Sequence, residues 1–126
     1  MGFKTARARV GGLGAAHEGT GHWWQQRLTA LALVLLAPLF VVPFAHALGS
    51  GHAYVVALYS SPYHALVAVL FLAVGFRHLA LGLQVVIEDY VPEKGWCTAL
   101  LIANTMFCFV LALIGIFAVA KIALAG

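Results

Sequence analysis

The stretch FLAVGFRHLALGLQVVIEDYV, residues 71–91, decides the fold that the sequence predicts. It is apolar for most of its length, yet it contains Arg77 and His78 and ends in Glu88-Asp89-Tyr90. A helix advances about 1.5 Å and 100° per residue, so His78 and Asp89 lie about 16 Å apart and within about 20° of one direction. We therefore expect a long apolar helix with an imidazole inside it and an acidic, aromatic end.

Two glycines flank the histidine on this expected helix. Gly75 precedes His78 by three residues and Gly82 follows it by four, so all three share one face. Two positions without side chains beside an imidazole leave room for a large flat group, and a haem is our main hypothesis. The alternative is that the glycines allow close packing of a neighbouring helix and that His78 forms an interhelical hydrogen bond.

The composition indicates an integral membrane protein. Of the 126 residues, 63% are hydrophobic and only 9% are charged, whereas soluble domains have about 25% charged residues. The mean hydropathy of +1.00 agrees. The length fits one domain. The net charge of +3 comes from scattered basic residues, so we expect no binding to nucleic acid.

The two cysteines do not indicate a disulfide or a metal cluster. Cys97 and Cys108 are expected on one helix, about 16 Å apart by the helical rise, and a disulfide needs Cα atoms within about 7 Å. No CxxC or CxxCH sequence is present, which argues against an iron–sulfur site and against covalently attached haem. We expect both to be small buried thiols.

Three apolar runs predict an all-α protein with three transmembrane helices. Each is long enough for a hydrocarbon core of about 30 Å. Pro38 and Pro43 are expected to kink the first span. The connections are expected to be a loop from Gly49 to Pro62 and a tight turn at residues 93–95. The predicted divisions are a flexible basic tail at 1–18, a membrane anchor at 19–126, and spans at about 28–48, 63–91 and 98–123.

The distribution of basic residues predicts how the chain crosses the membrane. Five basic residues lie on the side of the N-terminus and of the second connection, against Lys121 alone on the other; the five are Lys4, Arg7, Arg9, Arg27 and Lys94. Because basic residues are enriched on the cytoplasmic side, we expect the N-terminus in the cytoplasm and the C-terminus in the periplasm. The Asp89-Tyr90 end of the second span is then cytoplasmic.

A haem on His78 would need a second chain. A low-spin b-type haem has two axial ligands at one depth, and the third span contains no histidine. His64 is about 21 Å along the helix from His78, and His46 is expected near the outer boundary. The second axial ligand is therefore expected from a partner subunit.

The pattern His78-x3-Gly82-x6-Asp89-Tyr90-Val91 resembles the second span of the small hydrophobic membrane-anchor subunits of succinate dehydrogenase, respiratory complex II. The run from Gln84 to Tyr90 is similar to the alphaproteobacterial, cytochrome b556 type. The segment Arg27-Leu28-Thr29-Ala30 resembles the opening of the first span in the same family. The resemblance covers residues 19–121.

This resemblance implies roles for individual residues. It implies that His78 is an axial ligand of haem b and its iron and that Arg27 lies near the propionates. The spacing of Gly75 and Gly82 around His78 adds the notch for the haem, and His22, which precedes Arg27 at the same interface, is expected to join the propionate cluster. The resemblance implies that Tyr90 donates a hydrogen bond to a ubiquinone carbonyl and that Asp89 lies beside the proton supply. Arg77 matches no residue of the pattern, and a haem propionate or a partner carboxylate would satisfy it.

The resemblance also implies the assembly. It implies a non-catalytic subunit of an enzyme, with a larger cytochrome b anchor, an iron–sulfur subunit and a flavoprotein subunit as partners in a bacterial cytoplasmic membrane; the mitochondrial inner membrane is the less favoured location. A fumarate reductase anchor is one alternative. Another is a haem-free structural membrane subunit in which His78 serves helix association. Transport is disfavoured because no polar path or pair of broken helices is evident.

Overall fold

The computed structural model describes residues 16–125, and this part is entirely helical apart from its short connections. It contains four helices: α2 (Ala16–Ala47), α3 (His52–Tyr59), α4 (Pro62–Tyr90) and α5 (Lys94–Ala125). Three of them, over Thr20–Ala47, Pro62–Tyr90 and Lys94–Ala125, are long and apolar enough to cross a membrane. This confirms the all-α architecture with three helices able to span a membrane. Most of the predicted tail lies outside the described residues, and residues 16–18 belong to α2.

The two connections differ from the sequence-based expectation. The predicted loop contains a helix, α3, which follows Gly49 and Gly51, both at φ 83°, a backbone conformation that glycine adopts without strain. The expected turn at residues 93–95 is shorter than predicted. Pro92 ends α4 because the residue before a proline is held extended, and α5 begins at Lys94, where the Glu93 carbonyl accepts the first helical hydrogen bond from Cys97.

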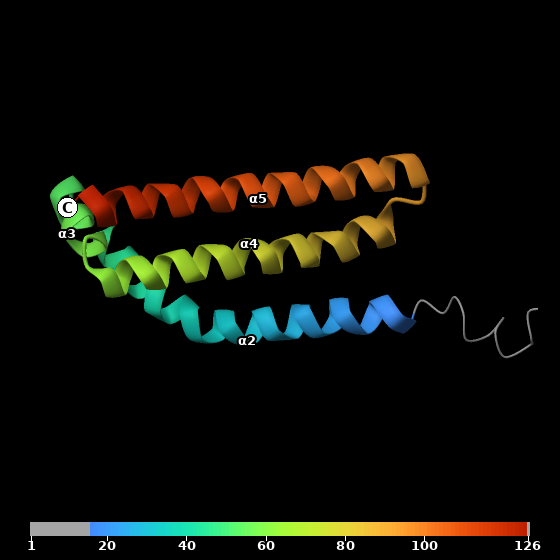
Figure 1. Cartoon of the computed structure of the whole chain (residues 1–126), viewed down its shortest axis with the longest axis horizontal. Coiled ribbons are helices and arrows are strands. Elements are labelled where there is room, and N and C mark those ends of the chain that lie inside the picture. Colours follow the sequence, from blue (N-terminus) through green and yellow to red (C-terminus); the bar gives the residue numbers. More distant parts are fainter. Residues whose placement is uncertain (1–15, 126) are drawn as a thin grey trace, which may run out of the picture.

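The long helices form a single layer with α4 in the middle (Figure 1). α4 packs against α2 on one side and α5 on the other, and α2 and α5 do not contact each other within the described residues. A single layer buries little apolar surface. Only seven hydrophobic residues are buried in the described part: Ala47, Tyr59, Ala65, Val67, Ala68, Leu81 and Cys108. The exposed apolar faces are therefore suited to contact lipid or partner helices.

Aromatic stacking holds the far part of α2 against α4. The Phe40 ring stacks on the Phe71 ring with centroids 4.4 Å apart and an interplanar angle of 14°. Pro38 and Pro43 lie inside α2, and Figure 1 shows that its C-terminal third, in teal, departs from the line of its first part. Because an internal proline removes one helical hydrogen bond and crowds the preceding turn, these prolines account for the bend.

A polar side chain and a glycine join α5 to α4. Asn104 Nδ2 donates a 2.9 Å hydrogen bond to the Ala80 carbonyl oxygen. At Gly115, an added Cβ would lie 3.0 Å from Leu72 Cδ1, so the missing side chain allows close approach of the two helices. The hydrogen bond of Asn104 was not predicted from the sequence, although Asn104 is the one strongly polar side chain inside the third apolar run.

The substitution Asn104→Leu should weaken the α4–α5 contact. Interhelical hydrogen bonds in membranes contribute about 0.6 kcal/mol on average and up to about 1.7 kcal/mol, so we expect a loss within that range. The measurement is the denaturation midpoint of the purified complex in detergent. Thr98→Val is the control, because the Thr98 hydroxyl bonds only to the Lys94 carbonyl of its own helix. An unchanged midpoint for Asn104→Leu would contradict this role.

Candidate functional site

A groove between α2 and α4 brings together three of the residues singled out by the sequence. His22 and Arg27 come from α2 and His78 from α4. The groove has a volume of about 390 Å³ and is also lined by Trp23, Gln26, Ala30 and Val85. Because α2 and α4 run antiparallel as consecutive spans, the start of α2 lies beside the second half of α4 (Figure 1).

The imidazole of His78 forms a hydrogen bond across this helix pair. Its Nδ1 lies 2.9 Å from Thr29 Oγ1, in a partly buried position. The same hydroxyl is 2.8 Å from the Gln25 carbonyl oxygen and 3.1 Å from that of Gln26, both on α2. Sequence reasoning missed the role of Thr29, because 49 residues separate it from His78. The interhelical hydrogen bond considered for His78 is present, and it uses one of the two ring nitrogens.

The groove also contains polar atoms without a partner. Within the described residues, His22 Nε2 and Gln26 Oε1 are buried and have no hydrogen-bond partner. Burying an unpaired polar atom is costly, so these atoms are suited to contact a group that the chain alone does not supply. Arg27 is exposed, and its guanidinium lies 5.1 Å from the centroid of the Trp23 ring, a cation–π geometry.

Arg77 lies next to His78 in sequence but has different contacts. Its guanidinium donates a hydrogen bond to Gln25 Oε1 of α2. This partner is a neutral amide of the same chain, whereas the sequence suggested a propionate or a partner carboxylate. This hydrogen bond uses one of the five N–H donors of the guanidinium. Because the Gln25 amide is neutral, it does not neutralise the positive charge of Arg77.

The two glycines face α2. An added Cβ at Gly82 would lie 3.5 Å from Gln26 Nε2, and one at Gly75 would lie 3.9 Å from Leu33 Cδ2. Both distances are ordinary van der Waals contacts. Within this chain, therefore, it is α2 that occupies the face of α4 bearing the glycines, which is the helix-packing alternative for these two positions.

Asp89 and Tyr90 lie apart from the groove, in the last turn of α4. Both are exposed, and 81% of the Tyr90 surface is accessible. Neither side chain has a hydrogen-bond partner among the described residues. Tyr90 is twelve residues beyond His78, which corresponds to about 18 Å along the helix. The two groups of candidate residues on α4 are therefore well separated along the helix.

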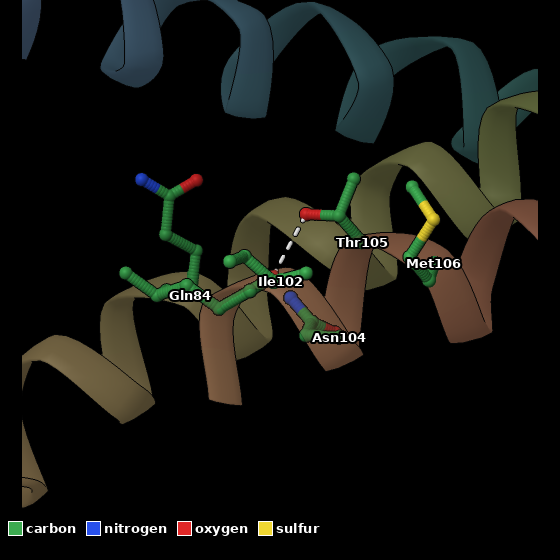
Figure 2. Close-up of a pocket in the computed structure, with 6 residues that line it drawn as sticks. Gln84, Ile102, Asn104, Thr105 and Met106 are labelled. Atoms are coloured by element: carbon green, nitrogen blue, oxygen red, sulfur yellow. Dashed lines mark hydrogen bonds between the residues drawn. The ribbon is translucent and has the colours of Figure 1, made fainter. Parts of the chain in front are cut away.

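A second groove, between α4 and α5, was not predicted (Figure 2). It has a volume of about 350 Å³ and is lined by Gln84, Leu101, Ile102, Asn104, Thr105 and Met106. Its polar groups have partners within the chain: Gln84 Nε2 donates to Glu88 Oε1 at 2.9 Å, and Thr105 Oγ1 donates to the Leu101 carbonyl oxygen at 2.9 Å. These polar groups therefore do not indicate a ligand.

The described residues contain no cluster of three or more His, Cys, Asp or Glu side chains able to hold a metal ion. The chemistry of the α2–α4 groove rests instead on a single imidazole of α4 with basic residues nearby. Such an arrangement can supply one axial ligand to a metal held otherwise by its own macrocycle.

The comparisons with known proteins identify the family. The family model described as "Succinate dehydrogenase/Fumarate reductase transmembrane subunit" matches residues 1–117. The succinate dehydrogenase hydrophobic membrane anchor subunit of Paracoccus denitrificans is 35% identical over 98% of this chain and 95% of that protein. The subunit of the same name from Rickettsia conorii is 26% identical over 86% of each chain. No solved structure matches significantly. The chain therefore belongs to the family of succinate dehydrogenase and fumarate reductase transmembrane subunits.

Proposed function

We propose that this chain is the small membrane anchor of a succinate:ubiquinone oxidoreductase and that it provides one side of a b-type haem site and part of a ubiquinone site. The observation that carries the proposal is the groove in which His78, His22 and Arg27 meet. The family alone does not distinguish a haem-binding anchor from a structural one, whereas this convergence of an imidazole and basic groups is what a haem with two carboxylates requires.

The residues present fit a haem. His78 offers one ring nitrogen beyond the one bonded to Thr29, and imidazole is a common axial ligand of haem iron. The unpartnered His22 Nε2 and the Arg27 guanidinium are suited to receive propionate oxygens, which accept hydrogen bonds. When bound, the haem supplies one-electron redox chemistry. A histidine of a larger cytochrome b anchor would supply the second iron ligand, since α5 contains no histidine.

The ubiquinone site is proposed at the end of α4. The Tyr90 phenol, with an ordinary pKa of about 10, stays protonated at neutral pH and can donate a hydrogen bond to a quinone carbonyl. The adjacent Asp89 carboxylate is exposed and can exchange protons with the aqueous phase. Because Tyr90 is 81% exposed in the isolated chain, the rest of the site is supplied by partner subunits that cover it.

The remaining partners follow from the same proposal. The chain carries neither a flavin motif nor a cluster motif, so succinate oxidation belongs to a flavoprotein subunit and an iron–sulfur subunit docked at the Tyr90 end. The complex would lie in a bacterial cytoplasmic membrane. A fumarate reductase anchor and a haem-free structural anchor are the two competing functions.

We also propose that the N-terminus is cytoplasmic. Arg27 lies in the first half of α2 and Lys94 is the first residue of α5, whereas Lys121 lies close to the C-terminal end of α5. The starts of α2 and α5 lie at the same end of the layer (Figure 1), and basic residues favour the cytoplasmic side. The orientation is measured by labelling single cysteines introduced into a variant that carries Cys97→Ser and Cys108→Ser. A membrane-impermeant maleimide should label Ser50→Cys in intact spheroplasts and Glu93→Cys only after the membrane is opened. The reverse pattern would exclude this orientation.

Co-purification from detergent-solubilised membranes tests the function as a whole. A tagged chain should bring down three partner chains: one flavin-containing, one carrying iron–sulfur clusters and one membrane-spanning. The reduced-minus-oxidised spectrum of the complex should show a b-type haem. A complete complex with succinate–quinone activity but no haem would favour the structural anchor. Preferential reduction of fumarate with quinol would favour the fumarate reductase alternative.

A further inference from the structure

The hydroxyl of Thr29 lies between the His78 ring and two carbonyl groups of α2. Thr29 Oγ1 is 2.8 Å from the Gln25 carbonyl oxygen, 3.1 Å from the Gln26 carbonyl oxygen and 2.9 Å from His78 Nδ1. A threonine hydroxyl has one hydrogen to donate and two lone pairs that accept. The carbonyl oxygens can only accept, so the single hydrogen is directed to α2 and a lone pair is available to Nδ1.

We infer that Thr29 accepts a hydrogen bond from Nδ1–H of His78 and is thereby the positioning residue for the haem ligand, an inference that rests on the proposed function. A neutral imidazole has one N–H, so a proton on Nδ1 leaves the lone pair on Nε2, the form that binds a metal. Metal-binding histidines almost always donate their other N–H to an oxygen atom, usually of a carboxylate, a backbone carbonyl or a water molecule. Thr29 supplies this oxygen from a different helix.

The bond also fixes the orientation of the ring. The side chain of Thr29 is held by the backbone of its own helix, and α2 is held against α4 by the Phe40–Phe71 stack further along. The imidazole is therefore restrained about its χ angles before any ligand binds. Without the acceptor, Nδ1–H is left unpaired in a partly buried position, and the ring can rotate or change tautomer.

Two measurable consequences follow. Partners of metal-binding residues typically change metal affinity by about 10- to 100-fold when they are removed, so loss of the Thr29 hydroxyl should speed haem loss by about tenfold or more. The Nδ1–H hydrogen bond makes the imidazole more basic, and a more basic axial ligand favours the ferric state. Its loss should therefore raise the reduction potential of the haem.

The experiment compares three variants of the whole complex. Thr29→Val removes the hydroxyl at nearly constant volume, and Thr29→Ser keeps it. Thr105→Val is the matched control, because the Thr105 hydroxyl bonds to the Leu101 carbonyl of its own helix and is exposed. The rate of haem loss is measured as the transfer of haem to apomyoglobin. The reduction potential is measured by redox titration of the haem absorbance. If Thr29→Val does not assemble, Thr29→Ala takes its place.

We expect faster haem loss and a higher reduction potential for Thr29→Val, with both quantities for Thr29→Ser and Thr105→Val close to those of the unaltered complex. An unchanged rate and potential for Thr29→Val would overturn the role of Thr29 and leave the proposed haem site intact. An equal change in Thr29→Val and Thr105→Val would also overturn it, because removal of a hydroxyl that does not contact His78 would then have the same effect on the haem. Absence of haem from the unaltered complex would instead refute the proposed function, and the role of Thr29 with it.

Discussion

His78→Ala should remove the proposed b-type haem from the assembled complex. The substitution deletes the α4 imidazole that lines the α2–α4 groove, and this ring is the proposed ligand of the haem iron. We expect the haem content per flavin to fall at least tenfold, because removal of even a hydrogen-bond partner of a metal ligand typically costs about 10- to 100-fold in metal affinity. Pyridine haemochrome analysis beside flavin determination measures it.

A histidine on the same helix provides the control. His64 lies about 21 Å away along α4 and, like His22, has a buried ring nitrogen without a partner in the described structure. His64→Ala should leave the haem content unchanged. Equal haem contents in His78→Ala and His64→Ala would show that His78 serves only helix association through Thr29.

Tyr90→Phe should lower ubiquinone reduction by about tenfold. The change removes one hydroxyl from an exposed ring. A hydrogen bond contributes about 0.5–1.5 kcal/mol, and about 1.4 kcal/mol in the transition state corresponds to a factor of ten in rate. Succinate oxidation with an artificial electron acceptor should be unchanged, because that reaction bypasses the membrane site. The two activities are measured on the same preparation.

Tyr63 provides a matched comparison for this substitution. It lies at the opposite end of α4 and is 56% exposed. Tyr63→Phe should leave both activities at the level of the unaltered complex. If Tyr90→Phe behaves like Tyr63→Phe, Tyr90 is an interfacial anchor and the quinone site lies elsewhere.

The spans were predictable because each one is a local property of the sequence. Twenty or more apolar residues ended by Pro92 or by Gly49 identify a membrane helix without knowledge of its neighbours. The α3 helix was missed for the same reason: its eight residues are too few for the length criterion, and the glycines before it are typical of a loop. Its position depends on contacts with the other helices.

The candidate site was predictable only in part. The residue pattern identified His78, Arg27 and His22, which the structure brings into one groove. The hydrogen-bond partners of His78 and Arg77 were not predicted. Thr29 and Gln25 reach these two side chains only because of the register of α2 against α4. That register is set by packing such as the Phe40–Phe71 stack, and no spacing within either helix specifies it. The glycines were ambiguous because a missing side chain accommodates a helix as well as a cofactor.

The most direct measurement is an experimental density map of the complete complex in the membrane region. We expect a porphyrin whose iron is bound by His78 Nε2, a second axial histidine from the partner anchor, and Thr29 Oγ1 within hydrogen-bond distance of Nδ1. A map in which the His78 ring contacts only Thr29 and lipid, with no porphyrin beside it, would contradict the account.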